Sequence, residues 1–259
     1  MALIRLNELS KTVRLGELDV HVLKSVSLSI EYGTLVALMG PAGLSKKTLV
    51  NILGCLDRPT AGEYWLDGTD VSRLASDLQA ALRNRKIGLA FQNLGLLTGL
   101  SVLENVLVPS LYGTRQLAEW ECHQRAVDLL RQVGLESRLD DDPAHLSTSD
   151  CRRVALARAL VNDPPLLLTD EPTRNLDACA RAAILDLFEQ FIAERGITIV
   201  VATDDVEVGN RARRVLHISD GSIAEGAVEV PGPTPTGIRP GAPPDQALPR
   251  HLDTRIVSG

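Results

Sequence analysis

A glycine-rich segment holds the residues of this sequence whose types and spacing are best suited to chemistry. It reads Gly40-Pro41-Ala42-Gly43-Leu44-Ser45-Lys46-Lys47-Thr48, and it lies between an apolar run over 35–39 and a helical pattern at Leu49, Ile52, Leu53 and Leu56. A strand, a glycine-rich loop and a helix N-terminus in this order direct backbone N–H groups at a phosphate. We therefore predict a phosphate-binding loop, with Gly40 and Lys46 at their places in the pattern G-x-x-x-x-G-K-[ST].

Two positions of this loop depart from the pattern. Ser45 stands where the second glycine belongs, so its side chain crowds the phosphate, and a left-handed backbone there would cost about 1 kcal/mol more. Lys47 replaces the hydroxyl residue that binds magnesium, and an ammonium has no lone pair to offer a metal. Thr48 cannot substitute, because the next helical position points about 100° away. We expect impaired binding of Mg²⁺.

The elements that position this loop follow from the apolar patterns. Residues 1–33 alternate apolar and polar, which predicts short antiparallel strands, and residues 70–90 predict a helix followed by a strand. Residues 95–163 are mostly helical in pattern. Two largely apolar runs, 166–169 and 197–201, are typical of parallel strands covered on both faces, and Asp170 and Glu171 follow the first.

Composition limits the possible functions. A chain of 259 residues can form one large α/β domain with a subdomain. The net charge of −6 and the aromatic content of 3% argue against a nucleic-acid partner, which favours a basic and aromatic face. The seven prolines after residue 229 predict that 229–259 is a disordered tail, so the folded domain is expected over 1–228.

Cysteine spacing and hydropathy give weaker signals. Cys55, Cys122, Cys151 and Cys179 form no C-x-x-C pair, so free thiols are expected. The start of the chain looks like an edge strand rather than a signal peptide, and no apolar run approaches the roughly 18 residues of a membrane span. We expect a cytoplasmic chain that reaches a membrane only through a partner.

Further segments follow the loop in a characteristic order. They are Gln92 after an apolar strand, Leu146-Ser147 before Arg153-Val154-Ala155-Leu156-Ala157-Arg158-Ala159-Leu160, Asp170-Glu171-Pro172-Thr173, and Asn175-Leu176-Asp177. Together they resemble the nucleotide-binding subunit of an ABC transporter. The resemblance is strongest to the branch that serves lipoprotein-releasing and macrolide-export permeases. That branch is also similar in the segment Asn51-Ile52-Leu53-Gly54-Cys55-Leu56-Asp57-Arg58-Pro59. The resemblance covers residues 2 to about 226. It implies an α/β fold with a P-loop NTPase (RecA-like) core, an antiparallel β subdomain and a helical subdomain at about 95–163.

The resemblance also implies roles for individual residues. Lys46 would contact the β- and γ-phosphates of ATP, with Thr48 near the α-phosphate. Gln92 would sense Mg²⁺ and the attacking water, Asp170 would hold Mg²⁺ through water, and Glu171 would be the general base. The residues implied to contact the nucleotide are Gly40, Gly43, Ser45, Lys46, Lys47, Thr48, Ser147 and Asp177.

In this family two subunits pair head to tail. Ser147, in the signature segment Leu146-Ser147-Thr148-Ser149-Asp150, would then face the γ-phosphate held by the opposite subunit, and Asp177 would communicate across the dimer. Here Thr148 and Ser149 replace two glycines, and Asp150 adds a charge that repels phosphate at a cost of a few kcal/mol. We interpret Thr148 and Ser149 as N-cap residues of a helix beginning near Asp150.

Two more departures concern the base and the terminal phosphate. Val13 stands where an aromatic residue would stack on adenine. Asp204 stands where a histidine is expected, and an ionised aspartate cannot donate a hydrogen bond to phosphate. The sequence thus predicts the ATP-binding subunit of a transporter, with weak or absent hydrolysis.

Several alternatives stay open. The chain could be a non-catalytic scaffold or regulatory subunit, of a permease or of an intact paralogue, and in a mixed dimer it would impair both composite sites. The implied partner is a membrane permease, docked near Leu94 to Asn105, at the inner or plasma membrane, with a homodimer and a heterodimer both possible. A DNA-maintenance ABC protein is disfavoured, since no long coiled-coil insertion is present. The transported substrate is not encoded here.

Overall fold

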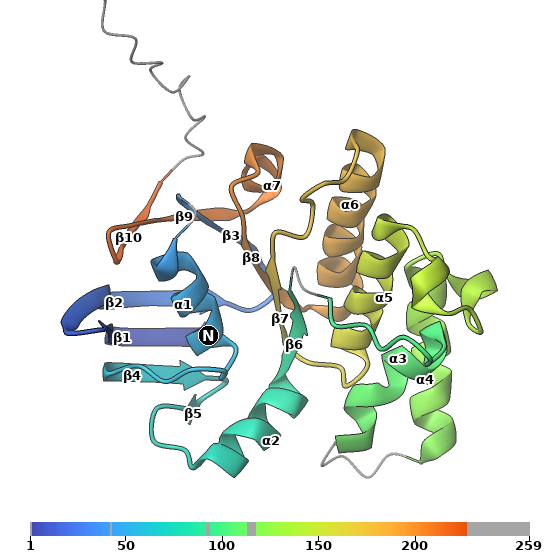
Figure 1. The fold of residues 1–259 in the computed structure, drawn as a ribbon, viewed down its shortest axis with the longest axis horizontal. Coiled ribbons are helices and arrows are strands. Elements are labelled where there is room, and N and C mark those ends of the chain that lie inside the picture. The colour runs from blue at the N-terminus through green and yellow to red at the C-terminus, as the bar shows by residue number, and fades with distance from the viewer. Residues whose placement is uncertain (1, 42, 92–93, 113–117, 227–259) are drawn as a thin grey trace, which may run out of the picture. The chain divides into compact units, whose positions relative to one another are not determined.

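Two sheets organise the part of the chain that the computed structural model describes, which is residues 2–226 except 42, 92–93 and 113–117 (Figure 1). The first is antiparallel, with strand order β2-β1-β4-β5. The second has the order β10-β9-β3-β8-β7-β6; its strands are parallel except that β10 pairs antiparallel with β9. The strands are β1 (Ala2–Leu15), β2 (Leu18–Glu31), β3 (Leu35–Met39), β4 (Ala61–Leu66), β5 (Thr69–Asp70), β6 (Ile87–Ala90), β7 (Leu166–Asp170), β8 (Thr198–Ala202), β9 (Arg214–Ser219) and β10 (Ser222–Glu225).

The N-terminal strands are longer than the alternation predicts. β1 and β2 each span 14 residues and pair antiparallel almost throughout. Register shifts in β1, one of them between Leu6 and Leu9, mark bulges that let so long a strand bend. Leu6 and Leu9 are both buried, because the bulge restores the inward face after the shift.

The parallel sheet positions the glycine-rich loop and the carboxylates predicted for the site. β3 and β8 are buried at every residue, and β7 is buried up to Asp170, as the apolar runs predict. β3 lies between β9 and β8, and β7 lies on the other side of β8. Since the carboxyl ends of parallel strands share one edge of the sheet, the loops after β3, β7 and β8 meet there.

Helices cover both faces of this sheet (Figure 1). α1 (Leu44–Leu53) packs in a core that includes the antiparallel sheet and one face of β3 and β8. The other face packs against α5 (Thr148–Leu160), α6 (Ala178–Arg195) and the helices before them. The remaining helices are α2 (Ser76–Lys86), α3 (Val102–Leu107), η1 (Val108–Tyr112), α4 (Glu119–Gln132), η2 (Glu136–Arg138), η3 (Pro143–His145) and α7 (Val206–Arg211).

The element predictions agree with the structure except at the end of α1 and after β8. The described part of 95–163 is helical and connecting segments, and α6 ends at Gly196, whose φ of 64° is left-handed. Leu56 lies beyond α1, which ends at Leu53. The pattern analysis missed α7, β9 and β10. The predicted tail, 229–259, lies outside the described residues.

None of the helices in the described ranges combines the length and hydropathy needed to cross a bilayer.

Candidate functional site

The glycine-rich loop joins β3 to α1, as predicted. Gly40 has a φ of 145°, and a Cβ built on it would lie 2.2 Å from the carbonyl oxygen of Ile218 in β9, so only glycine fits. Gly43 is the N-cap of α1 and has no side chain, so no side chain caps the first-turn N–H groups, and the first turn contains no acidic residue. These N–H groups are donors suited to an anion.

Lys46 lies at the centre of the site. Its side chain is only 7% exposed, and its Nζ donates to the carbonyl oxygen of Gly40 at 3.2 Å and to Oε1 of Glu171 at 3.4 Å. It also forms an ion pair with Oδ1 of Asp204. An ammonium has three donors, and all three here point at oxygens of the chain itself.

Glu171 is held by contacts on every side. It follows β7 with a left-handed φ of 48°, and its N–H donates to the carbonyl oxygen of Ala202 at 2.8 Å. Its Oε2 accepts a hydrogen bond from Oγ1 of Thr203 at 3.1 Å. The guanidinium of Arg152 donates to the carbonyl oxygen of Glu171 at 3.1 Å and to that of Arg174 at 2.6 Å. Thr203 thus holds the carboxylate of Glu171, whereas Ala202 at the end of β8 and Arg152 in α5 hold its backbone.

Asp170 is the last residue of β7 and lies near several cationic side chains. Burial raises the pKa of its carboxyl, whereas Lys46, Lys47 and Arg174 lower it by less and Asp204 adds to the rise. The structure therefore brings together Lys46, Asp170, Glu171 and Asp204, which come from three separate segments of the sequence. Gln92, predicted to sense both metal and water, lies outside the described residues.

The residues present do not fit Mg²⁺ bound in the manner of a P-loop. Magnesium requires oxygen ligands in near-octahedral geometry, and the exposed Lys47 supplies a cation at the position that should supply a hydroxyl. Within the described ranges, no group of three or more His, Cys, Asp or Glu side chains is arranged to hold a metal ion.

The left-handed backbone for which strain was expected at Ser45 does not occur. Ser45 is the second residue of α1, so its backbone is right-handed and a side chain there costs no left-handed strain. Its half-buried side chain still lies where the pattern has none, and Thr48 is half-buried one turn along the same helix. The crowding of phosphate by Ser45 stays a prediction.

The signature segment forms the start of α5, but its N-cap differs from the predicted one. Ser147 caps the helix, which begins at Thr148, because its Oγ accepts from the N–H of Asp150 at 3.1 Å. The same hydroxyl lies 2.8 Å from Oδ2 of Asp150, to which it donates. The Ser147 hydroxyl therefore uses its one donor in a hydrogen bond to Asp150 of the same chain. Oγ of Ser149 is buried with no hydrogen-bond partner among the described residues.

Asp177 and Val13, also predicted for the site, make local contacts. Asp177 is the N-cap of α6, where its Oδ1 accepts from the N–H of Ala180 at 2.8 Å. Val13 lies in β1 and pairs with Val20 of β2 at the hairpin. Asp205, next to Asp204, caps α7 and accepts from Oγ1 of Thr173 at 2.8 Å.

Sequence reasoning missed two positioning residues, Thr203 and Arg152. Thr203 immediately follows an apolar strand and precedes Asp204, which is a signal that could have found it. Arg152 follows the signature by two residues and is 8% exposed, but its contact with the loop after β7 spans 19 residues of sequence and has no local signal.

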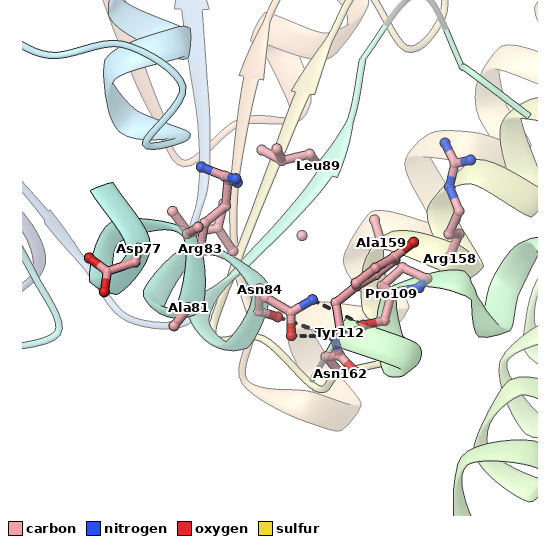
Figure 2. A pocket seen from close by; sticks show the side chains of 13 residues that line it. Asp77, Ala81, Arg83, Asn84, Leu89, Pro109, Tyr112, Arg158, Ala159 and Asn162 are labelled. Atoms are coloured by element: carbon pink, nitrogen blue, oxygen red, sulfur yellow. Dashed lines mark hydrogen bonds between the residues drawn. The ribbon is translucent and has the colours of Figure 1, made fainter. Parts of the chain in front are cut away.

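A second concave region lies between α2 and the end of α5 (Figure 2), with a volume of about 580 Å³. Nδ2 of Asn162 donates to Oδ1 of Asn84 at 3.1 Å and to the carbonyl oxygen of Pro109 at 3.2 Å, which ties α2, η1 and the end of α5 together. Tyr112 lines the groove and is 75% exposed. Arg158, also in the lining, donates to the carbonyl oxygens of Leu94 and Gly95.

The loop between β3 and α1, with carboxylates at the ends of neighbouring strands, defines a P-loop NTPase core. A model of the ABC transporter family matches residues 23–174. The macrolide export ATP-binding/permease protein MacB of Syntrophobacter fumaroxidans is 49% identical over 86% of this chain and 31% of that protein. The uncharacterized ABC transporter ATP-binding protein YvrO of Bacillus subtilis is 42% identical over 85% of this chain and 95% of that protein. The chain therefore belongs to the ABC transporter family as an ATP-binding cassette.

The predicted likeness to the macrolide-export branch is confirmed, and the chain spans about a third of the length of those relatives. Solved structures confirm the predicted fold class. The dimeric ATP-binding cassette MJ0796, in a post-hydrolysis state with ADP and Pi, matches with a TM-score of 0.80 at 36% identity over 88% of this chain and 99% of that one. CbiO1 of Clostridium perfringens, part of an ABC transporter complex, matches with a TM-score of 0.78 at 28% identity over 87% and 88%.

Proposed function

We propose that this chain is the ATP-binding subunit of an export-type ABC transporter in which nucleotide hydrolysis is weak or absent. The relatives named for macrolide export support the export assignment, and the phosphate loop supports nucleotide binding. One observation carries the proposal of weak hydrolysis: Asp204 and Glu171 both contact the ammonium of Lys46. In a working site that ammonium neutralises phosphate, and Glu171 is free to polarise water.

Three further features support weak turnover. Lys47 offers no ligand to Mg²⁺, which neutralises developing charge in phosphoryl transfer. Asp150 accepts the hydrogen bond of the Ser147 hydroxyl and adds a negative charge at the N-terminus of α5. If subunits pair head to tail, both halves of each composite site carry a defect. A homodimer of this chain would then hydrolyse ATP poorly at both sites.

The groove between α2 and α5 is our candidate for permease contact. The exposed Tyr112 of η1 lines it, and Arg158 links it to Leu94, the start of the segment predicted for docking. Asn105, the far end of that segment, is fully buried and hydrogen-bonded to the loop that precedes it, so it is not a contact residue. Through this contact the chain would be peripheral to the membrane on its cytoplasmic side.

The test is an Mg-ATPase assay of the purified chain, alone and with its permease, beside the Glu171→Gln variant. We expect turnover no higher than that of Glu171→Gln, since the general base has little substrate to act on. Turnover that Glu171→Gln abolishes would contradict weak hydrolysis and leave nucleotide binding intact.

A regulatory role is the second candidate, favoured by the same ion pair of Lys46 and Asp204. In a mixed dimer with an intact paralogue, each composite site would contain one defective half from this chain. We expect a purified mixed dimer to hydrolyse ATP more slowly than the paralogue homodimer. Full activity of the mixed dimer would exclude this role.

A further inference from the structure

Asp204 places a negative charge where a terminal phosphate has to bind. In the P-loop pattern the lysine reaches the β- and γ-phosphates, and here the ammonium of Lys46 is already paired with Oδ1 of Asp204. The carboxylate therefore stands in for the phosphate group farthest from the nucleoside.

The position of Asp204 is fixed from both sides in the sequence. The N–H of Thr203 donates to the carbonyl oxygen of Leu38 in β3 at 3.1 Å, and the N–H of Asp205 donates to Oγ1 of Thr203 at 3.0 Å. The backbone at 204 is thus tied to the strand that leads into the phosphate loop. The side chain of Asp204 is 53% exposed, so it reaches the buried Lys46 from the solvent side.

A nucleoside diphosphate and a nucleoside triphosphate would contact different groups of this site. A diphosphate can use the uncapped N–H groups at Gly43 and the first turn of α1, and its β-phosphate can take a donor of Lys46 without displacing Asp204. A γ-phosphate has to displace Asp204 from Lys46, and it also approaches Glu171, whose Oε1 is 3.4 Å from the same ammonium. Two carboxylates near a phosphate repel it in a half-buried site.

We propose that Asp204 makes this pocket select nucleoside diphosphates over nucleoside triphosphates. Asp204 is then a specificity-determining residue, and the pocket favours the product of the family reaction over its substrate. The inference rests on the proposed function only in requiring that the loop after β3 binds nucleotide.

The test compares the affinities of the purified chain for ADP and for the β,γ-imido analogue of ATP by isothermal titration calorimetry. Both are measured with magnesium and with EDTA, so that a metal requirement of the triphosphate is not mistaken for selectivity. We expect ADP to bind at least about tenfold more tightly in both buffers. Asp204→Asn keeps the shape and removes the charge, and it should bring the two affinities within about threefold of each other.

Asp128→Asn is the matched control. Asp128 is a similarly exposed aspartate, 46% against 53%, and it pairs with Arg131 in α4, away from the phosphate loop. This variant should keep the wild-type preference for ADP. Asp204→His, which restores the residue that the family pattern expects, serves as a second variant should Asp204→Asn fail to fold by circular dichroism.

The outcomes separate the two proposals. Equal or tighter binding of the triphosphate by the wild type, or an unchanged preference in Asp204→Asn, overturns the selectivity and leaves nucleotide binding standing. Absence of binding by both nucleotides overturns nucleotide binding and the selectivity with it.

Discussion

The ammonium of Lys46 lies 3.4 Å from Oε1 of Glu171, whose side chain is only 13% exposed. We expect Lys46→Met to destabilise the fold by about 2 kcal/mol, because it leaves a nearly buried carboxylate without its cation. Adding Glu171→Gln to that variant should recover part of the loss. Urea denaturation measures both, with Lys86→Met, which breaks a more exposed pair with Asp67, as the milder control. A Lys46→Met chain as stable as the wild type would contradict this account.

Lys47 should determine whether magnesium strengthens the binding of ATP. For the wild type we expect the affinity for ATP to be the same with magnesium as with EDTA, since an ammonium stands at the metal-ligand position. Lys47→Thr restores a hydroxyl, and it should make magnesium tighten binding by about tenfold. The exposed Lys24 of β2 gives the control, because Lys24→Thr makes the same chemical change outside the site. Wild-type binding that requires magnesium would refute the prediction.

Gly40 is required by the fold itself. Gly40→Ala places a Cβ 2.2 Å from the carbonyl oxygen of Ile218, so β3 and β9 must move apart. We expect a loss of about 3 kcal/mol in the free energy of unfolding. Gly68→Ala is the control: its φ of 75° is also left-handed, but nothing lies within 4 Å of the added Cβ, so about 1 kcal/mol is expected. Equal losses would mean that the contact with Ile218 relaxes freely.

The four cysteines are free, as predicted, and they should differ in reactivity. Burial raises the pKa of the Cys55 thiol from 9.0 to about 11, while Arg83 lowers it by less. At neutral or mildly alkaline pH this cuts its thiolate fraction about a hundredfold relative to an ordinary thiol. Cys179 is exposed. We expect iodoacetamide to modify Cys179 first and Cys55 only after denaturation, as read by peptide mass spectrometry; early labelling of Cys55 in the folded chain would be inconsistent with its burial.

The groove beside η1 can be tested through its exposed aromatic residue. Tyr112→Ala should lower the yield of permease that co-purifies with the chain, because the docked permease loses a contact of large apolar area. Trp120 in α4 is similarly exposed, at 69% against 75%, and it does not line the groove, so Trp120→Ala is the control. Equal yields from the two variants would place the permease contact elsewhere.

The order of strands and loops could be predicted because it is written in local patterns. The apolar run before Gly40 and the run ending at Asp170 and Glu171 identify strands of a parallel sheet, and the shared edge of that sheet brings their loops together. Contacts between particular side chains could not be predicted from the sequence. That Asp204 contacts Lys46 depends on side chains 158 residues apart in sequence, and that Ser147 rather than Thr148 caps α5 depends on a one-residue difference in helix start.

The bonds of Arg152 have a mechanical consequence. This guanidinium, carried by the helix that begins at the signature segment, grips two carbonyl groups of the turn that follows β7. A tilt of that helix would therefore pull on the turn that orients Glu171. The two hydrogen bonds of Arg152 thus couple the position of the signature helix to that of the carboxylate.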